Sequence, residues 1–308
     1  MQRTLNELET AIGAGRLFDY SGVEWSRVQR SRYLIHQHLR YDYPGPISQL
    51  RQHLVILPPE RYGDQMRIAF RFAVSAEKAE TTYQLDESGN NEISIFVPHI
   101  ERYIDFDAWI LVERGAQNQE NLLSSRWLTD PRMAEPSTLT QPDETLRHVA
   151  SMLLAEGKQG LALAERIMHR VYQHVRYESN VTDIHTTAAE AWRLGKGVCQ
   201  DYAHCMLALC RLCQLPARYV SGHMLGEGGT HAWVEVLVPG QQADIALAVP
   251  FDPTHDRRVG LSYVTIATGR DYFDVAPTSG TYLAAYSGQL SGHKQVDLMQ
   301  VEYMESTR

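Results

Sequence analysis

Cys199 has the sequence context of a nucleophilic thiol. It follows the segment Gly195–Val198, whose two glycines make a poor helix interior, and it precedes a run of Ala, Met, Leu and Cys residues that ends at Pro216. We predict a buried helix with Cys199 in its first turn, where the helix dipole and the unpaired backbone N–H groups favour the thiolate. Such a thiolate can attack the carbonyl carbon of an amide, provided that a base and a group that orients the base lie nearby.

His231 is the candidate base. It opens a stretch of alternating polar and apolar residues up to Val238, a pattern typical of a strand, and Ile245–Phe251 is a second apolar run beyond a turn signal. A hairpin centred near residue 241 would place His231 opposite Phe251 or Asp252, with about 5 Å between Cβ atoms. The imidazole and the Asp252 carboxylate are therefore predicted to be neighbours.

Competing assignments for these groups come from nearby residues. His255 and Asp256 remain an alternative base and carboxylate for the same cleft. His204 lies inside the predicted helix and faces another side of it. The other three thiols are predicted to be core residues, because a redox Cys-x-x-Cys pair needs the amino end of a helix and their offsets do not give a zinc site on one helix face: Cys205, Cys210 and Cys213.

Four motifs occur in the order typical of one family: Gly197–His204 (Gly-Val-Cys-Gln-Asp-Tyr-Ala-His), Pro216–Gly222, His231–Glu235 and Phe251–Thr254. Together they resemble the transglutaminase-like superfamily and, more narrowly, its bacterial transglutaminase-like cysteine protease members. The resemblance runs from about residue 33 to about residue 286. It implies a papain-like triad carried by Cys199, His231 and Asp252.

Other residues are candidates for the cleft and the oxyanion site. The backbone N–H of Cys199 is a natural first donor to an oxyanion, because it lies at a helix start. Gln200, Tyr177 and Trp192 are candidates for the second donor. Trp233, on the His231 face of its strand, either lines the substrate channel or packs against the helix.

The predicted reaction is acyl transfer from a peptide, protein or amide substrate through a thioester. Hydrolysis, by a protease or amidase, is the first expectation, because the resembling bacterial group is described in that way. Transfer to an amine by a transglutaminase uses the same triad, and a non-catalytic peptide-binding module is the alternative outside enzymes. This chemistry requires neither a metal nor a cofactor.

Composition limits the class of protein and its partners. The chain has 308 residues, a net charge of −8 and no long run of Lys or Arg, which argues against nucleic-acid binding. The amino terminus has no apolar signal segment and no stretch could span a bilayer, so we expect no membrane association. Together with unpaired thiols, this predicts a cytoplasmic protein. The sequence does not predict an oligomeric state.

The expected fold class is α+β. We divide the chain into a helical lead (residues 1–30), an antiparallel β-sandwich (31–115), a linker (116–142) and a catalytic domain (143–308) in which the cysteine helix packs on an antiparallel sheet. Within the catalytic domain, Thr187–Glu190 is a capping box that opens a short helix closed by Gly195, and Ala217–Met224 is expected to form a strand. Val296–Tyr303 is expected to close the sheet as a late strand.

Two features have more than one interpretation. The glycine-rich segment Leu225–Thr230, directly before His231, fits a flexible lid beside the cleft and fits a plain hairpin loop equally well. His36 and His38, on a predicted strand, and His53 are interpreted as polar surface residues rather than metal ligands, because no Cys or acidic partner lies at ligand spacing.

Overall fold

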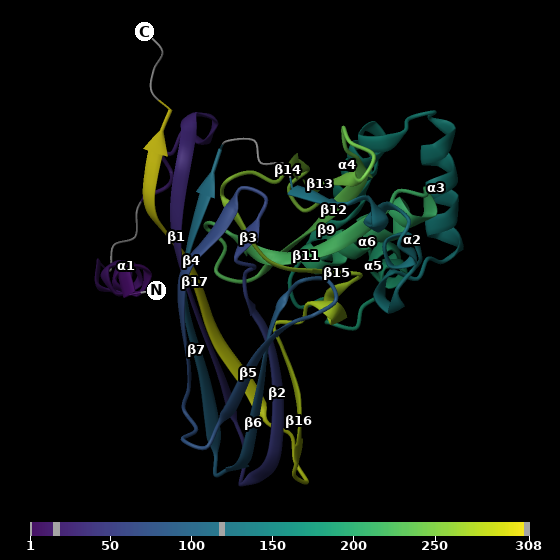
Figure 1. Ribbon diagram of the computed structural model, residues 1–308. Helices are drawn as coiled ribbons and strands as arrows, with labels where there is room; N and C mark the ends of the chain where they lie inside the picture. Colours follow the sequence, from purple (N-terminus) through teal and green to yellow (C-terminus); the bar gives the residue numbers. More distant parts are fainter. Residues whose placement is uncertain (1, 15–18, 117–120, 305–308) are drawn as a thin grey trace.

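The computed structural model describes residues 2–14, 19–116 and 121–304. An elongated sandwich of two β-sheets stands beside a lobe in which helices pack against one face of a third sheet (Figure 1). The α+β class with an amino-terminal β-region is therefore confirmed.

The sandwich consists of antiparallel strands whose apolar residues alternate toward a shared core, including Ile35, Leu54 and Phe106. One sheet has five strands in the order β17 (Gln289–Tyr303), β1 (Val28–Asp42), β7 (Tyr103–Gly115), β4 (Gln65–Val74) and β3 (Arg61–Tyr62). The other has four strands in the order β16 (Thr278–Leu283), β2 (Ile47–Leu57), β6 (Asn91–Ile100) and β5 (Glu80–Leu85).

Strands β16 and β17 join the sandwich from the far end of the chain. β17 pairs with β1 from Asp42↔Gln289 to Val28↔Tyr303, and the two ribbons run side by side in Figure 1. This pairing differs from the expected catalytic domain of residues 143–308, in which Val296–Tyr303 would close the sheet. The physical reason is the free edge of β1, whose backbone N–H and C=O groups need a partner strand.

The helical lead is α1 (Gln2–Ala14), which packs on the outer face of the five-stranded sheet. Leu8 is fully buried there against Leu34, Ala69 and Leu111. This second small core attaches the lead to the sandwich.

The third sheet supports the cysteine helix. Its strands follow the order β14 (Arg257–Arg258), β13 (Ile245–Asp252), β12 (His231–Pro239), β11 (Ala217–Met224) and β15 (Tyr263–Gly269), and β8 (Asn121–Ser124) pairs with β13. Helix α6 (Cys199–Leu212) lies on β12 and is enclosed by α3 (Glu144–Ala155), α4 (Gly160–His174) and α5 (Ala188–Leu194). Every α6 residue from Asp201 to Arg211 is buried, as the apolar run predicted.

Short elements complete the lobe. β9 (Arg176–Tyr177) and β10 (Lys196–Gly197) form a parallel pair. The remaining helical turns are α2 (Pro131–Ala134) and the 3₁₀ helices η1 (Trp25–Arg27), η2 (Ser125–Leu128), η3 (Thr138–Thr140) and η4 (Tyr272–Asp274). No described helix is both long enough and apolar enough to cross a membrane.

Much of the predicted linker is folded onto the third sheet. β8 adds a strand to β13, and Trp127 and Met133 pack on Leu237 and Ala248. Residues 117–120, which include Asn118, lie outside the described residues. The described part of residues 121–142 therefore covers the sheet. The proline content of this segment predicted a linker instead.

Side-chain amides of the sandwich cap the outer edge of β15. The side chain of Gln65 accepts a hydrogen bond from the Thr265 backbone N–H at 2.8 Å and donates one to the Thr265 C=O at 2.8 Å. Asn90 makes the same two contacts, each 2.8 Å long, with Thr268. Each amide reproduces the pairing of a neighbouring strand, so this sheet edge is covered and the two lobes are joined.

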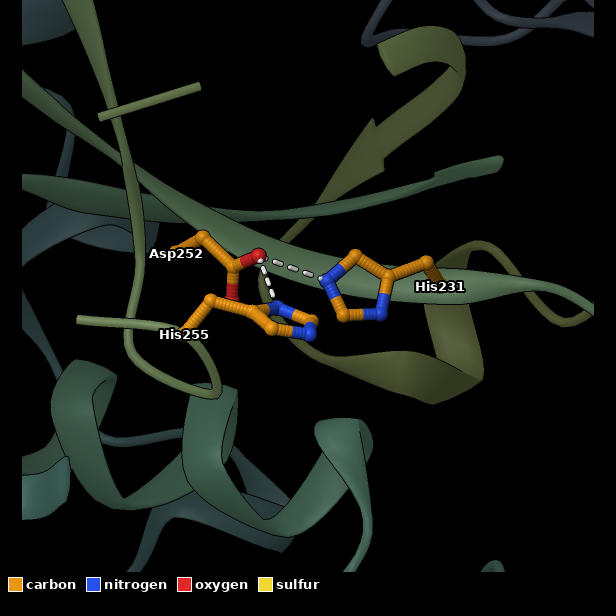
Figure 2. Close-up of side chains that lie close together, drawn as sticks. All are labelled: His231, Asp252 and His255. Atoms are coloured by element: carbon orange, nitrogen blue, oxygen red, sulfur yellow. Dashed lines mark hydrogen bonds and ion pairs between the residues drawn. The ribbon is translucent and has the colours of Figure 1, made fainter. Parts of the chain in front are cut away.

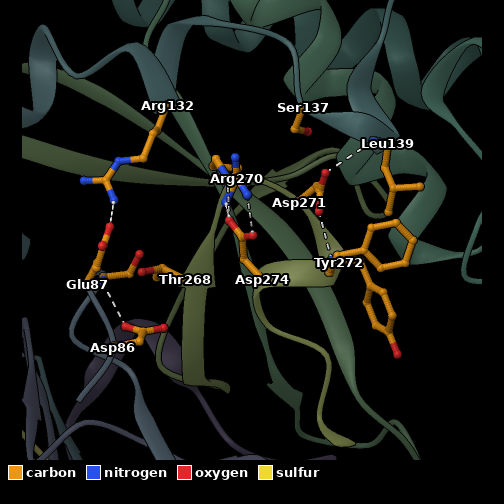
Figure 3. Close-up of polar contacts among 12 residues, drawn as sticks. Asp86, Glu87, Arg132, Ser137, Leu139, Thr268, Arg270, Asp271, Tyr272 and Asp274 are labelled. Atoms are coloured by element: carbon orange, nitrogen blue, oxygen red, sulfur yellow. Dashed lines mark hydrogen bonds and ion pairs between the residues drawn. The ribbon is translucent and has the colours of Figure 1, made fainter. Parts of the chain in front are cut away.

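Charged contacts continue this junction around the end of β15 (Figure 3). Nη1 of Arg132, a residue of α2, donates to Glu87 Oε2 of the sandwich at 2.8 Å, and Arg270 Nε donates to Asp274 Oδ2 at 2.9 Å. Asp271, which is buried, accepts hydrogen bonds from the backbone of Leu139 and Phe273. These contacts hold the turn after β15 against the segment that leads into α3.

The second face of the third sheet is covered by the sandwich. Ala232 and Val234 face α6 as the alternation predicted, but Glu235 on the opposite face is also buried. Its carboxylate accepts hydrogen bonds from Arg218 Nε (2.8 Å) and from Tyr62 Oη of β3 (2.6 Å). The strand that carries His231 is therefore fixed from both sides.

Candidate active site

Cys199 begins α6 and is partly exposed, whereas Cys205, Cys210 and Cys213 are buried; all four thiols are free. The chain approaches the cysteine through α5, which is capped by Thr187 and Glu190 and ended by Gly195 at φ 64°, as the sequence predicted. Because the first N–H groups of a helix have no carbonyl partner within it, the Cys199 backbone N–H is available to an oxyanion.

A buried carboxylate fixes the start of α6. Asp201 Oδ2 accepts hydrogen bonds from the Val198 N–H at 2.8 Å and from Thr182 Oγ1 at 2.7 Å. A Cβ at Gly197 would collide with this carboxylate, so the turn before the cysteine requires glycine. The backbone on which the thiol stands is thus held in one position.

His231 and Asp252 are in direct contact in a buried site. His231 Nε2 lies 2.8 Å from Asp252 Oδ2, and neither side chain is exposed to solvent (Figure 2). Burial alone would lower the pKa of His231, but hydrogen bonds with Asp252, the Cys199 thiol and Glu227 raise it far above its usual range. The imidazole is therefore held by Asp252, and the groups around it, which include Cys199, favour its protonated form.

The strand register that brings His231 and Asp252 together differs from the predicted register. In the β12–β13 ladder Val234, not His231, pairs with Phe251, because the hairpin closes between Gly240 and Ile245. His231 precedes the first pair of the ladder and Asp252 follows the last one on its strand. The predicted register is therefore wrong, although the two side chains meet at the end of the ladder.

Asp252 has more partners than a triad requires. Its Oδ2 also accepts a hydrogen bond from Tyr263 Oη at 2.7 Å and lies 2.8 Å from His255 Nδ1, while Oδ1 accepts from the Thr254 N–H at 2.9 Å. Burial would raise the Asp252 pKa, but the hydrogen bonds from His231, His255 and Tyr263 outweigh it and hold the pKa well below its usual range. The carboxylate is therefore ionised.

The alternative pair of His255 and Asp256 is not formed. His255 binds Asp252 instead, and Asp256 lies 2.7 Å from Nδ1 of His169 on α4. Sequence reasoning also missed Tyr263, because nothing in the local pattern of β15 indicates that its first residue reaches a carboxylate on β13.

Of the four candidates for the cleft and oxyanion site, Tyr177 is the one whose pKa is affected by Cys199. It lies on β9, opposite Gly197, and its pKa is raised by burial and then by the charges of Cys199 and Glu227. The Gln200 amide points to the Asp183 carbonyl at 3.4 Å. Trp192 is buried and stacked on His174 at 3.9 Å between ring centroids.

Trp233 is buried on the His231 face of β12, with its ring edge-on to Tyr263 at 5.5 Å. A Cβ at Gly222 would collide with the indole, so the ring lies flat against the β11 backbone. Trp233 also lines a cavity of about 840 Å³ between the two lobes. It therefore packs on the sheet rather than on α6.

A second cavity of about 830 Å³ adjoins the predicted triad. Its walls include Tyr177, Tyr202, the loop Glu227–Thr230 and His255. Glu227 connects the cavity to the buried histidine, because its Oε2 lies 3.0 Å from His231 Nδ1. The glycine-rich loop thus forms one wall of a space large enough for a peptide side chain or a small amide.

Comparison with known proteins agrees with this arrangement. Residues 147–245 match the model of the transglutaminase-like superfamily. An uncharacterized protein of Mycobacterium leprae is 35% identical over 116 residues, which are 34% of this chain and 39% of that protein. An uncharacterized protein of Mycobacterium tuberculosis is 37% identical over 122 residues, 36% of this chain and 38% of that protein.

The matched region thus spans less than two fifths of the length of these curated relatives. Among solved structures, a "Putative Cysteine Protease" from Cytophaga hutchinsonii has the same fold over most of this chain. Its TM-score is 0.72 at 22% identity, covering 90% of this chain and 94% of that one. In its motifs, and over residues 147–245, which hold Cys199 and His231, this chain is similar to the transglutaminase-like superfamily.

Proposed function

We propose that this protein is a cysteine-dependent enzyme that transfers the acyl group of a peptide or amide substrate to water. The transglutaminase-like match and the fold shared with a protein described as a "Putative Cysteine Protease" support a cysteine-dependent enzyme. One observation carries the finer proposal: the buried imidazole of His231 lies 2.8 Å from the Asp252 carboxylate, and Asp252, the Cys199 thiol and Glu227 raise its pKa.

The proposed mechanism assigns one role to each group. The Cys199 thiolate attacks the carbonyl carbon, and the oxyanion that forms accepts hydrogen bonds from the Cys199 N–H and the Tyr177 hydroxyl. The His231 imidazolium then donates its proton to the departing amine, leaving a thioester. Neutral His231 next removes a proton from water, the resulting hydroxyl attacks the thioester, and the acid is released with the thiolate restored.

Asp252 determines which nitrogen of His231 exchanges protons with the thiol and the leaving group. Because Nε2 faces Asp252, the thiol and the leaving group are assigned to Nδ1, which also lies 3.0 Å from Glu227 Oε2. The carboxylate also stabilises the imidazolium that forms with the thiolate. Since all four thiols are free, we place the protein in a reducing compartment, the cytoplasm.

A peptide library read by mass spectrometry tests the proposal. Wild-type protein should cleave a subset of peptides and leave a free carboxylate, and Cys199→Ala should cleave none. A parallel reaction with a primary amine separates hydrolysis from transfer, because transfer adds the mass of the amine to the product. Binding without turnover would instead favour a peptide-binding module, and cleavage by Cys199→Ala would exclude the mechanism.

A further inference from the structure

Three potential metal-ligand atoms converge at the end of β13. Nε2 of His231 and Nδ1 of His255 each lie 2.8 Å from Oδ2 of Asp252 (Figure 2). All three atoms lie within 4.8 Å of one another, and among the residues that the structure describes this is the one such group of His, Cys, Asp or Glu. Two imidazoles and a carboxylate suit Zn²⁺, which bonds their nitrogen and oxygen atoms at about 2.0–2.2 Å.

A second carboxylate lies behind both rings. Oε2 of Glu227 is 3.0 Å from His231 Nδ1, and Oε1 of Glu227 is 3.6 Å from His255 Nε2. The four side chains therefore form a closed ring in which imidazoles and carboxylates alternate. A histidine that binds a metal typically directs its other ring N–H to a carboxylate, which fixes the tautomer and the ring orientation.

Hydrogen bonds also hold the Asp252 carboxylate in place, as they do for the carboxylate ligands of metal ions. Tyr263 donates to Oδ2, and the Thr254 backbone donates to Oδ1, so the carboxylate has a fixed orientation. His255 is the residue that acyl transfer leaves unexplained, because one imidazole is sufficient to serve a thiol. About one third of the His255 side chain is exposed, and it lines the cavity beside Glu227, which gives a small cation a path to the cluster.

We propose that His231, Asp252 and His255 bind one Zn²⁺ ion, with Glu227 orienting both imidazoles and the fourth coordination position open to the cavity. Each imidazole binds as a neutral ligand, so a proton on its metal-facing nitrogen is released to solvent. Zn²⁺ on Nε2 replaces the hydrogen bond between His231 and Asp252. The ion therefore inhibits acyl transfer, a consequence that rests on the proposed function, whereas the binding itself does not.

The simplest rival site is a Zn²⁺ ion held by the Cys199 thiolate and His231. The two candidate sites differ in whether Cys199 is a ligand. In the proposed mechanism the thiol uses Nδ1 of His231, whereas the proposed ion binds Nε2, the nitrogen that faces Asp252. Cys199→Ala should consequently keep the proposed site and abolish the rival one.

Calorimetric titration of the purified full chain with ZnCl₂ tests binding without any substrate. Wild type and Cys199→Ala should each bind one Zn²⁺ ion with similar affinity. Glu227→Gln should weaken binding about 10–100-fold, as loss of an outer carboxylate does, and His255→Asn should weaken it further because a ligand is lost. MgCl₂ should give no binding at this site, since Mg²⁺ prefers oxygen ligands.

His169→Asn is the matched control, because His169 pairs with Asp256 at 2.7 Å just beyond the cluster but contributes no ligand. It should bind Zn²⁺ as wild type does. Melting temperatures in a chelator check that His255→Asn and Glu227→Gln are folded, and either variant decides the question. Unchanged affinity in a folded variant, or loss of binding in Cys199→Ala, would overturn the proposal.

An activity measurement separates this proposal from the proposed function. If a peptide substrate is found, Zn²⁺ should inhibit wild type, and a chelator should restore turnover. If no substrate is cleaved, the calorimetry still decides the metal site. If peptides are cleaved but Zn²⁺ neither binds nor inhibits, the metal site is wrong and the triad stands.

Discussion

Tyr263 donates a hydrogen bond of 2.7 Å to Asp252 Oδ2 from the opposite edge of the third sheet. The same hydroxyl accepts from Arg257 Nε at 2.8 Å, so it links the carboxylate to a cation. The triad proposed here therefore has a fourth member that positions its acid.

Tyr263→Phe should lower kcat/KM about tenfold, because a hydrogen bond to a charged group contributes about 1.5–3 kcal/mol and part of it orients Asp252. Tyr33→Phe is a matched control. Its hydroxyl donates to the Leu261 carbonyl at 2.6 Å near the same junction, without contacting Asp252. Both variants should melt a few degrees lower, and only Tyr263→Phe should lose activity. Equal activity in the two would remove Tyr263 from the site.

Cys199→Ala should abolish turnover and keep the melting temperature within a few degrees of wild type. Alanine is a favourable helix residue, and Cys199 is only partly buried. Cys210→Ala should keep its turnover but melt at a lower temperature, because the Cys210 thiol is fully buried and its loss leaves a cavity. Thermal melts and peptide assays on both variants measure this. Turnover by Cys199→Ala would contradict the assignment of the nucleophile.

Asp252→Asn should reduce turnover strongly with the fold intact. The amide cannot stabilise the imidazolium, and a comparable change in a serine triad costs roughly 10⁴ in rate. Asp256→Asn serves as the control, since it removes only the contact with His169 and should cost little activity. Steady-state kinetics compare them directly, and a larger loss in Asp256→Asn would mean that the carboxylate is assigned wrongly.

Local signals in the sequence were sufficient where a structure depends on neighbouring residues. Thr187, Glu190 and Gly195 predicted the helix before the cysteine, because capping groups act within one turn. The segment Ala217–Met224 matches β11 at both ends. The contact between His231 and Asp252 was also foreseen, although through a wrong register.

Interactions between distant segments were not predictable in this way. The pairing of β17 with β1 joins residues at opposite ends of the chain, and an alternating pattern does not specify its partner strand. The hydroxyl of Tyr263 and the amides of Gln65 and Asn90 act on residues of other strands. These contacts depend on tertiary structure. The alternating pattern of a strand does not indicate which distant residue a polar side chain will contact.

The junction at β15 should contribute to stability. Asn90→Ala removes two hydrogen bonds and leaves the buried N–H and C=O of Thr268 without partners, which should cost about 2–6 kcal/mol at 1–3 kcal/mol for each group. Gln84→Ala is the control, because its amide makes an exposed contact with Glu92 at 3.0 Å. Urea unfolding measures both variants. An unchanged midpoint for Asn90→Ala would show that the amide does not join the lobes.

The reactivity of the four thiols should separate Cys199 from the rest. Burial raises the pKa of the Cys213 thiol to about 11 and the pKa values of the Cys205 and Cys210 thiols still higher. Alkylation follows the thiolate fraction and access. At slightly acid pH, limiting iodoacetamide should therefore modify native protein at Cys199 alone, as peptide mapping by mass spectrometry would show.

Two further samples test the cause of this selectivity. His231→Ala should slow modification of Cys199, because the imidazolium that stabilises the thiolate is lost. Unfolding the protein before labelling should make all four thiols react alike, since burial is what distinguishes the other three. Preferential labelling of Cys210 or Cys213 in the native protein would contradict the placement of the nucleophile at the start of α6.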